Sequence, residues 1–165
     1  MTAQLLQQYI LHAEEAFDRQ EWLEAEQILK EALAEEPTFG MAHNHLGWLY
    51  IYYLCDYSLA EMHLRLALKY APRHRAPYLH MAHVLFESGN LKELEALLLV
   101  AESVTAVPRS FLHAHHAKIN EVSGRYQKAI ARYKLAIRWS TDETEIATLR
   151  SDIKRCRKKQ WMLWW

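Results

Sequence analysis

Hydrophobic residues recur along this chain at the three- and four-residue spacing of amphipathic helices, and the pattern itself repeats. Shifting the sequence by about 34 residues aligns one block with the next, and this is the period of a two-helix repeat. The most regular block reads Ala-x3-Leu-x2-Ala-x4-Pro and occurs at 25–37 and again at 60–72. Weaker copies begin at Leu94 and Ala129. The pattern therefore predicts a series of helix pairs.

A second block lies upstream of each later copy and carries a small residue at a matched position, namely Gly47, Ala82 and Ala117. Small residues let two helix backbones approach closely, and large partners such as Leu29 and Leu64 fill the remaining groove. Gly89 and Gly124 mark tight turns between helices, while prolines end two of the helix pairs because they lack an N–H group.

These signals predict nine helices and a modular organisation. We expect eight helices at 3–18, 21–35, 39–54, 57–70, 75–88, 91–105, 109–122 and 126–139. A ninth should run from Asp142 to about Lys159, with Ser140 or Thr141 as its N-cap. The expected modules are repeats at 6–39, 40–74, 75–109 and 110–141 (together 1–141), a C-terminal capping helix at 142–160 and a Trp-rich tail at 161–165.

The blocks resemble the tetratricopeptide repeat (TPR) family, whose unit reads W-x2-L-G-x2-Y, then G-x-Y, then A-x3-F-x2-A-x4-P. The resemblance covers residues 6 to 140, although the tryptophan of the first block is absent. It implies an all-α fold, a right-handed superhelix of antiparallel helix pairs (a TPR-like α-solenoid). It also implies a non-enzymatic scaffold or adaptor that binds a peptide or protein segment in a concave groove. Bacterial assembly or secretion chaperones are one version of that role.

In this family the first helix of each unit lines the groove, and the resemblance therefore assigns the partner-binding positions. The lining would be aromatic and rich in imidazole, and it would suit a peptide with apolar anchors. Trp48, Tyr52 and Phe111 are the expected hot spots, the alternative being that Trp48 and Tyr52 only pack against neighbouring helices. The assigned residues are Asn44, His45, Trp48, Tyr52, His80, His83, Glu87, Phe111, His115 and Lys118, with Gln7, Ile10, Glu14 and Met41 beside them.

Three histidines, His45, His80 and His115, are spaced 35 residues apart and so occupy equivalent positions in successive repeats. Equivalent helices lie about 8–10 Å apart, so two imidazoles but not three could share an ion without distortion. No metal ligand and no cofactor is therefore assigned, and a His-lined metal- or pH-responsive sensor is kept as an alternative function. His43 and His113 stand where the family has tryptophan, and we expect them to pack rather than to bind a ligand.

Composition supports a helical, non-catalytic protein. Only four glycines and four prolines occur in 165 residues, while 51% of the chain is hydrophobic and 24% is charged. Cys55 and Cys156 form no disulfide framework, and the N-terminus shows no signal peptide, so a soluble, cytoplasmic protein is expected. Phosphate-binding loops, nucleophile elbows and H-E-x-x-H motifs do not occur, so an enzyme is not expected.

A net charge of zero conceals a strong gradient along the sequence. Residues 1–36 carry a net charge of −7, and residues 109–165 carry +8, which could steer partners or favour head-to-tail contacts between copies. The basic end of the last helix precedes the tail at 161–165. Because tryptophans are unfavourable in water, we expect the tail to pack within the chain or on another subunit. Packing on another subunit would make a homo-oligomer through the tail. A peripheral membrane adaptor is the alternative, and nucleic acid is not an expected partner.

Overall fold

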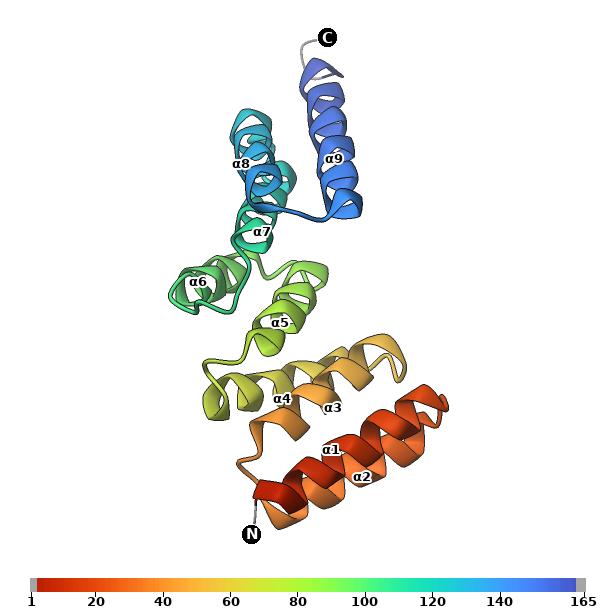
Figure 1. The fold of residues 1–165 in the computed structure, drawn as a ribbon. Coiled ribbons are helices and arrows are strands. Elements are labelled where there is room, and N and C mark those ends of the chain that lie inside the picture. Colours follow the sequence, from red (N-terminus) through yellow and green to blue (C-terminus); the bar gives the residue numbers. More distant parts are fainter. Residues whose placement is uncertain (1–2, 163–165) are drawn as a thin grey trace. The chain divides into compact units, whose positions relative to one another are not determined.

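The computed structural model describes residues 3–162, and within that range it contains helices and no strand. The chain divides into two compact units, Met1–Ser88 and Gly89–Trp165, which are described separately. Their boundary falls inside the third predicted repeat, between its two helices. The helices of Figure 1 are α1 (Ala3–Asp18), α2 (Trp22–Glu35), α3 (Gly40–Tyr52), α4 (Tyr57–Tyr70), α5 (Arg75–Glu87), α6 (Leu91–Ala101), α7 (Arg109–Val122), α8 (Tyr126–Trp139) and α9 (Glu143–Met162).

Helix positions follow the prediction closely, and the differences occur at helix ends. Helix α3 stops at Tyr52 because Cys55 adopts a positive φ of 53° and the amide of Asp56 bonds back to the carbonyl of Tyr50. Helix α6 stops at Ala101, since the amides of Ser103 and Val104 bond three residues back and tighten the chain into turns. The predicted N-cap of α9 is wrong: Asp142 accepts the amides of Thr144 and Glu145 at 2.7 and 3.0 Å.

Unit 1 is built from α1 to α5, which pack as neighbours through small residues. Alanines such as Ala13, Ala25 and Ala60 are fully buried where the helices meet. Gly47 makes the closest approach, because a Cβ atom added there would lie 2.6 Å from Cγ of the buried Leu64 on α4. The large side chain of Leu64 thus occupies the space that a side chain at position 47 would need.

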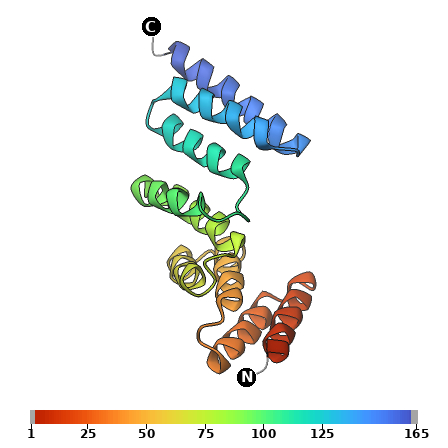
Figure 2. The same ribbon diagram turned by 60° about the vertical axis from the view of Figure 1, so that its left-hand side comes forward.

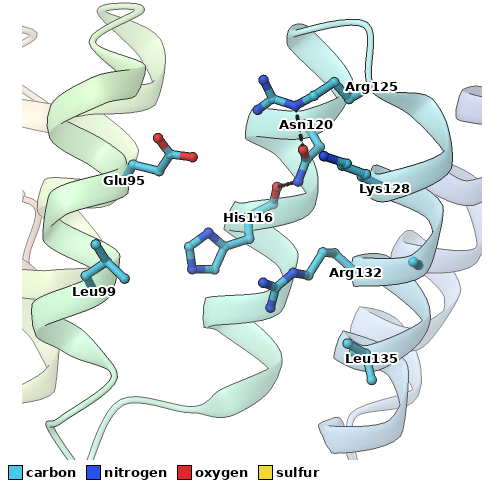
Figure 3. Close-up of a pocket in the computed structure, with 9 residues that line it drawn as sticks. Glu95, Leu99, His116, Asn120, Arg125, Lys128, Arg132 and Leu135 are labelled. Atoms are coloured by element: carbon cyan, nitrogen blue, oxygen red, sulfur yellow. Dashed lines mark hydrogen bonds between the residues drawn. The ribbon is translucent and has the colours of Figure 1, made fainter.

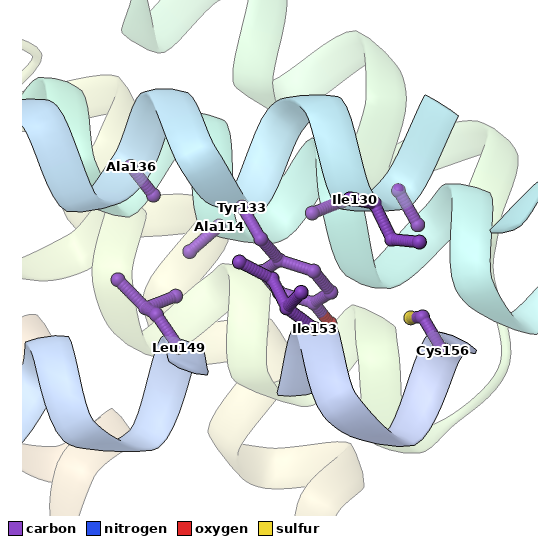
Figure 4. Packing of buried hydrophobic residues seen from close by; sticks show 9 residues of the cluster. Ala114, Ile130, Tyr133, Ala136, Leu149, Ile153 and Cys156 are labelled. Atoms are coloured by element: carbon purple, nitrogen blue, oxygen red, sulfur yellow. The ribbon is translucent and has the colours of Figure 1, made fainter. Parts of the chain in front are cut away.

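Unit 2 ends in a three-helix layer, in which α7 packs on α8 and α8 packs on α9 (Figures 1 and 2). Tyr133 on α8 is fully buried and reaches between the helices, beside Ile153 and Cys156 of α9 (Figure 4). Its hydroxyl donates to the buried carboxylate of Glu121 at 2.9 Å. The same carboxylate accepts from the guanidinium of Arg155 twice at 2.7 Å and from Lys159 at 2.8 Å.

This ion cluster ties α9 to the repeat that precedes it. Although burial alone raises the pKa of Glu121, the hydrogen bonds from Arg155, Lys159 and Tyr133 outweigh it and lower that pKa to about 2. Helix α9 runs on to Met162, and its last residues, Trp161 and Met162, are exposed. The rest of the predicted Trp-rich tail, 163–165, lies outside the described residues. Between residues 3 and 162 no helix is both long enough and apolar enough to cross a membrane.

Two histidines form a buried pair between α3 and α4. The Nδ1 atoms of His43 and His63 lie 3.0 Å apart, and Nε2 of His43 lies 3.1 Å from the carbonyl of Pro37. Because Nε2 of His43 must donate to that carbonyl, its Nδ1 accepts the proton carried by His63. Burial lowers the pKa of both groups, and the neighbouring His43 helps to bring that of His63 to about 4. The prediction that His43 packs in the core is confirmed.

Substituting Gly47 tests the close approach of α3 and α4. Gly47→Ala should lower the free energy of unfolding by about 1–3 kcal/mol through overpacking, despite the better helix propensity of alanine. In a Leu64→Ala background, which removes the obstructing atoms, the same substitution should be neutral or stabilising. Urea unfolding followed by circular dichroism gives both values. An equal cost in the two backgrounds would contradict the proposed contact.

The His43–His63 pair should make unit 1 sensitive to acid. Between pH 6.5 and about 4 the unfolded chain binds protons that the folded pair does not, so acidification favours unfolding. We expect the unfolding free energy to fall by more than about 1 kcal/mol across this range. Replacing both histidines by leucine should reduce this pH dependence of the unfolding free energy in urea and leave the part contributed by His80, whereas the exposed control His12→Gln should leave it unchanged. A double variant as acid-sensitive as the wild type would be the contrary result.

Candidate functional site

A hollow of about 260 Å³ opens on unit 1 and is lined by side chains from three helices. Phe17 comes from α1, His80 comes from α5, and Asn44, His45 and Trp48 come from α3. Trp48 follows Asn44 by four residues and His45 by three, the spacings that place side chains on one face of a helix. This face is the one that the sequence assigned to partner binding.

Aromatic rings form a continuous wall at the hollow. The ring of Trp48 meets Phe17 edge-on, with centroids 4.9 Å apart, and lies 6.0 Å from Tyr52. Tyr52 in turn stacks on His83 at 5.8 Å and meets His80 edge-on at 6.3 Å. Trp48 and Tyr52 thus contact neighbouring helices, and Tyr52 remains exposed, while their role as hot spots stays a prediction. Such aromatic faces suit apolar anchors.

Asn44 gives the hollow an unsatisfied polar group. The residue is only 6% exposed, yet its Oδ1 atom has no hydrogen-bond partner among the described residues. A buried carbonyl oxygen without a partner costs about 1–3 kcal/mol, and such atoms are rare in folded proteins. Because the Oδ1 atom itself has almost no accessible surface, an N–H or O–H donor that enters the hollow meets this acceptor when the Asn44 side chain turns toward it.

Histidines at the hollow are oriented by the fold. Nδ1 of His45 donates to the carbonyl of Met41 at 2.9 Å, and its ring stacks on Phe17. Burial, together with the nearby imidazoles of His45, His83 and His74, lowers the pKa of His80 to about 4. His80 is consequently neutral at pH 7 and lines the hollow without a charge.

The structure brings together some of the assigned residues and corrects others. Asn44, His45, Trp48, Tyr52, His80 and His83 gather around the hollow, whereas Glu87 is exposed at the end of α5. Ile10 does not line a groove, because it is buried in the core of unit 1. Phe17 was missed, although it continues by three residues the helical stripe that contains Glu14.

The remaining assigned residues lie on α7 in unit 2. Phe111 and His115 form a close pair, with ring centroids 4.0 Å apart, and Nδ1 of His115 donates to the carbonyl of Phe111 at 3.0 Å. Lys118 follows on the same helix and is partly buried. Their role in binding stays a prediction.

The repeated histidines of the sensor hypothesis separate into different surroundings. His45 and His80 both line the hollow of unit 1, and His115 lies in unit 2. Among residues 3–162 no group of three or more His, Cys, Asp or Glu side chains is placed to hold a metal ion. Acid sensitivity is expected at the His43–His63 pair, which lies away from the hollow's lining, and also at His80, whose pKa is likewise lowered to about 4.

Known proteins share the architecture of this chain. No protein-family model matches it and no curated protein matches it. One solved structure is that of PilW, described as a widely conserved type IV pilus biogenesis factor. The match covers 96% of this chain and 77% of the PilW chain, with a TM-score of 0.76 and 18% sequence identity.

Two further solved structures give the same picture. For PilF of Pseudomonas aeruginosa, the match covers 93% of this chain and 72% of the PilF chain, with a TM-score of 0.75 and 20% sequence identity. For MamA from Desulfovibrio magneticus RS-1, the match covers 95% of this chain and 92% of the MamA chain, with a TM-score of 0.70 and 18% sequence identity. These neighbours are TPR-like helical repeat proteins, and at this identity the likeness concerns the fold. The chain is therefore an all-α helical repeat solenoid of the TPR-like kind.

Proposed function

We propose that this protein is a non-enzymatic scaffold that binds a segment of a partner protein in the hollow of unit 1. The observation that carries the proposal is the unpartnered Oδ1 of Asn44, buried in a hollow with an aromatic wall. An isolated fold gains nothing from leaving this acceptor unpaired, whereas a bound segment that donates an N–H to it would recover the lost hydrogen bond. A TPR-like fold supports protein binding as the general role.

The lining also defines the kind of segment that fits. Trp48 and Phe17 offer ring faces to an apolar side chain, and neutral His80 adds no charge. Asn44 would accept a backbone N–H of an extended segment or a side-chain donor of a helical one. A segment with an apolar anchor next to a free donor group is therefore the proposed ligand. The hollow is small, so it would hold one anchor of a longer partner.

A role in assembly is the finer version of this proposal. PilW is described as a pilus biogenesis factor, and its fold covers nearly all of this chain, which supports a place in a bacterial assembly or secretion complex. In that setting the hollow would hold a subunit or component before or during assembly. Phe111, His115 and Lys118 would make a separate contact with a partner in unit 2.

Asn44→Leu tests the site, because it should separate binding from stability. Removing the unpaired acceptor should raise the unfolding free energy by about 1 kcal/mol, while capture of the partner should fall about tenfold or more. Wild-type protein immobilised in an extract of its own host provides the partners, which mass spectrometry identifies and quantifies. Unfolding is followed in urea on the same samples.

A matched tyrosine pair supplies the control. Tyr52→Ala removes an exposed ring next to Trp48 and should also reduce capture, whereas Tyr57→Ala removes a comparably exposed ring on α4 and should not. If Asn44→Leu and Tyr52→Ala retain the same partners in the same amounts as Tyr57→Ala, the hollow is not the binding site.

A further inference from the structure

A second concave site lies wholly within unit 2 and differs in chemistry from the hollow. It has a volume of about 650 Å³ and runs between α6 and α8, with part of α7 as its floor (Figure 3). Leu99 of α6 is 63% exposed at one wall, and Leu135 of α8 lies on the other. We call this site the α6–α8 groove.

Positive charge dominates the α8 wall of the groove. Lys128 and Arg132 lie one turn apart, and Leu135 follows one turn later on the same face. A guanidinium nitrogen of Arg132 lies 3.2 Å from Nδ1 of His113. Glu95, on the α6 wall, is the acidic residue of the lining. Burial and the nearby Arg132 lower the pKa of His116 at the floor, so this imidazole is neutral at pH 7. The α8 wall thus presents two cations followed by a leucine, and Arg125, which precedes α8 and donates to Asn120, adds a third cation to the lining.

The N-terminal helix of the same chain exposes the complementary sequence. On α1, Leu11 is 52% exposed, and Glu15 and Asp18 are exposed on the same face, four and seven residues later. Phe17, which lines the hollow, lies about a third of a turn away from this stripe. The α1 stripe (Leu11, Glu15 and Asp18) is therefore available without disturbing the hollow.

The two stripes match in register when the helices run antiparallel. Along α1 the order is Leu11, Glu15, Asp18, with spacings of four and three; along α8 in reverse it is Leu135, Arg132, Lys128, with spacings of three and four. Both stripes span about 10 Å of helix. Antiparallel contact therefore places leucine on leucine, Glu15 beside Arg132 and Asp18 beside Lys128.

We propose that the α6–α8 groove binds helix α1 of a second copy of this chain, antiparallel to α8. The leucine would enter between Leu99 and Leu135, and the two carboxylates would face the two cations. The same charge segregation appears in the whole sequence, with −7 over residues 1–36 and +8 over residues 109–165. Because the contact joins two different surfaces, a pair of copies keeps one free α1 helix on one copy and one free groove on the other, and association can continue head to tail.

Such a contact is weak and sensitive to salt. Exposed ion pairs contribute about 0.2–1 kcal/mol each, so self-association should appear only toward high protein concentration. Sedimentation velocity of the full chain, up to about 1 mM, measures it at about 0.01 M and about 1 M ionic strength, where the Debye length is about 30 Å and 3 Å. We expect concentration-dependent oligomers at low salt and monomers at high salt.

Charge reversal distinguishes this contact from any other. Glu15→Arg with Asp18→Lys, and separately Lys128→Asp with Arg132→Glu, should each remain monomeric at low salt. An equimolar mixture of the two variants should associate again, because each type of groove then finds a helix of opposite charge. Loss of folding cannot produce this recovery, and circular dichroism on each variant checks the fold.

Matched reversals away from the contact serve as controls. Glu31→Arg with Glu35→Lys on α2, and Arg150→Glu with Lys154→Glu on α9, change the same charges at exposed sites and should each associate like the wild type. The proposal is overturned if the wild type is monomeric at both salt concentrations. It is also overturned if the α1 and α8 variants associate as the wild type does, as expected for an oligomer formed through the C-terminal tail, or if their mixture stays monomeric.

Discussion

Close approach between helix backbones is the constraint on which this structure depends. Where Gly47 faces Leu64, and where alanines line the joints between helices, there is no room for a larger side chain. Small residues at matched positions of α1 to α5, α7 and α8 therefore fix which faces meet, and large residues such as Leu64 and Tyr133 fill the grooves that remain. Because the buried faces are settled in this way, other faces of α1, α3 and α5 stay open for the proposed binding site.

The hollow of unit 1 follows from that division of faces. Its aromatic wall is held by ring contacts from α1 through α3 to α5, so that Phe17, Trp48 and Tyr52 support one another while keeping open surface. Asn44 is one of two exceptions among the described residues, since its Oδ1 is buried without a hydrogen-bond partner, as is Nε2 of His116 in unit 2. In the core, by contrast, the polar groups of His43, His63 and Glu121 find partners. An unpaired polar atom at a concave surface is best understood as prepared for a ligand.

Sequence periodicity predicted the helices well, because buried alanines and leucines at helical spacing leave few alternative packings. Helix ends were harder to predict, because the positive φ of Cys55 and the cap by Asp142 depend on local hydrogen bonds that a hydrophobic pattern does not reveal. The aromatic and imidazole members of the site were found by analogy with repeat positions. Phe17 and the unpaired state of Asn44 were not, because both depend on how side chains from different helices meet. Ile10 was misassigned for the same reason, since its repeat position faces the core in the first helix.

The most direct test of the account is a side-chain nuclear magnetic resonance titration of the ¹⁵N-labelled protein with the partner that it captures. The side-chain amide of Asn44 and the indole N–H of Trp48 report on the hollow, while the indole of Trp139, exposed in unit 2 beside Arg109, provides an internal reference. If the partner occupies the hollow, the Asn44 and Trp48 signals should shift together and saturate at the same concentration, with Trp139 unchanged. Saturable shifts at Trp139 with Asn44 and Trp48 unmoved would contradict the account.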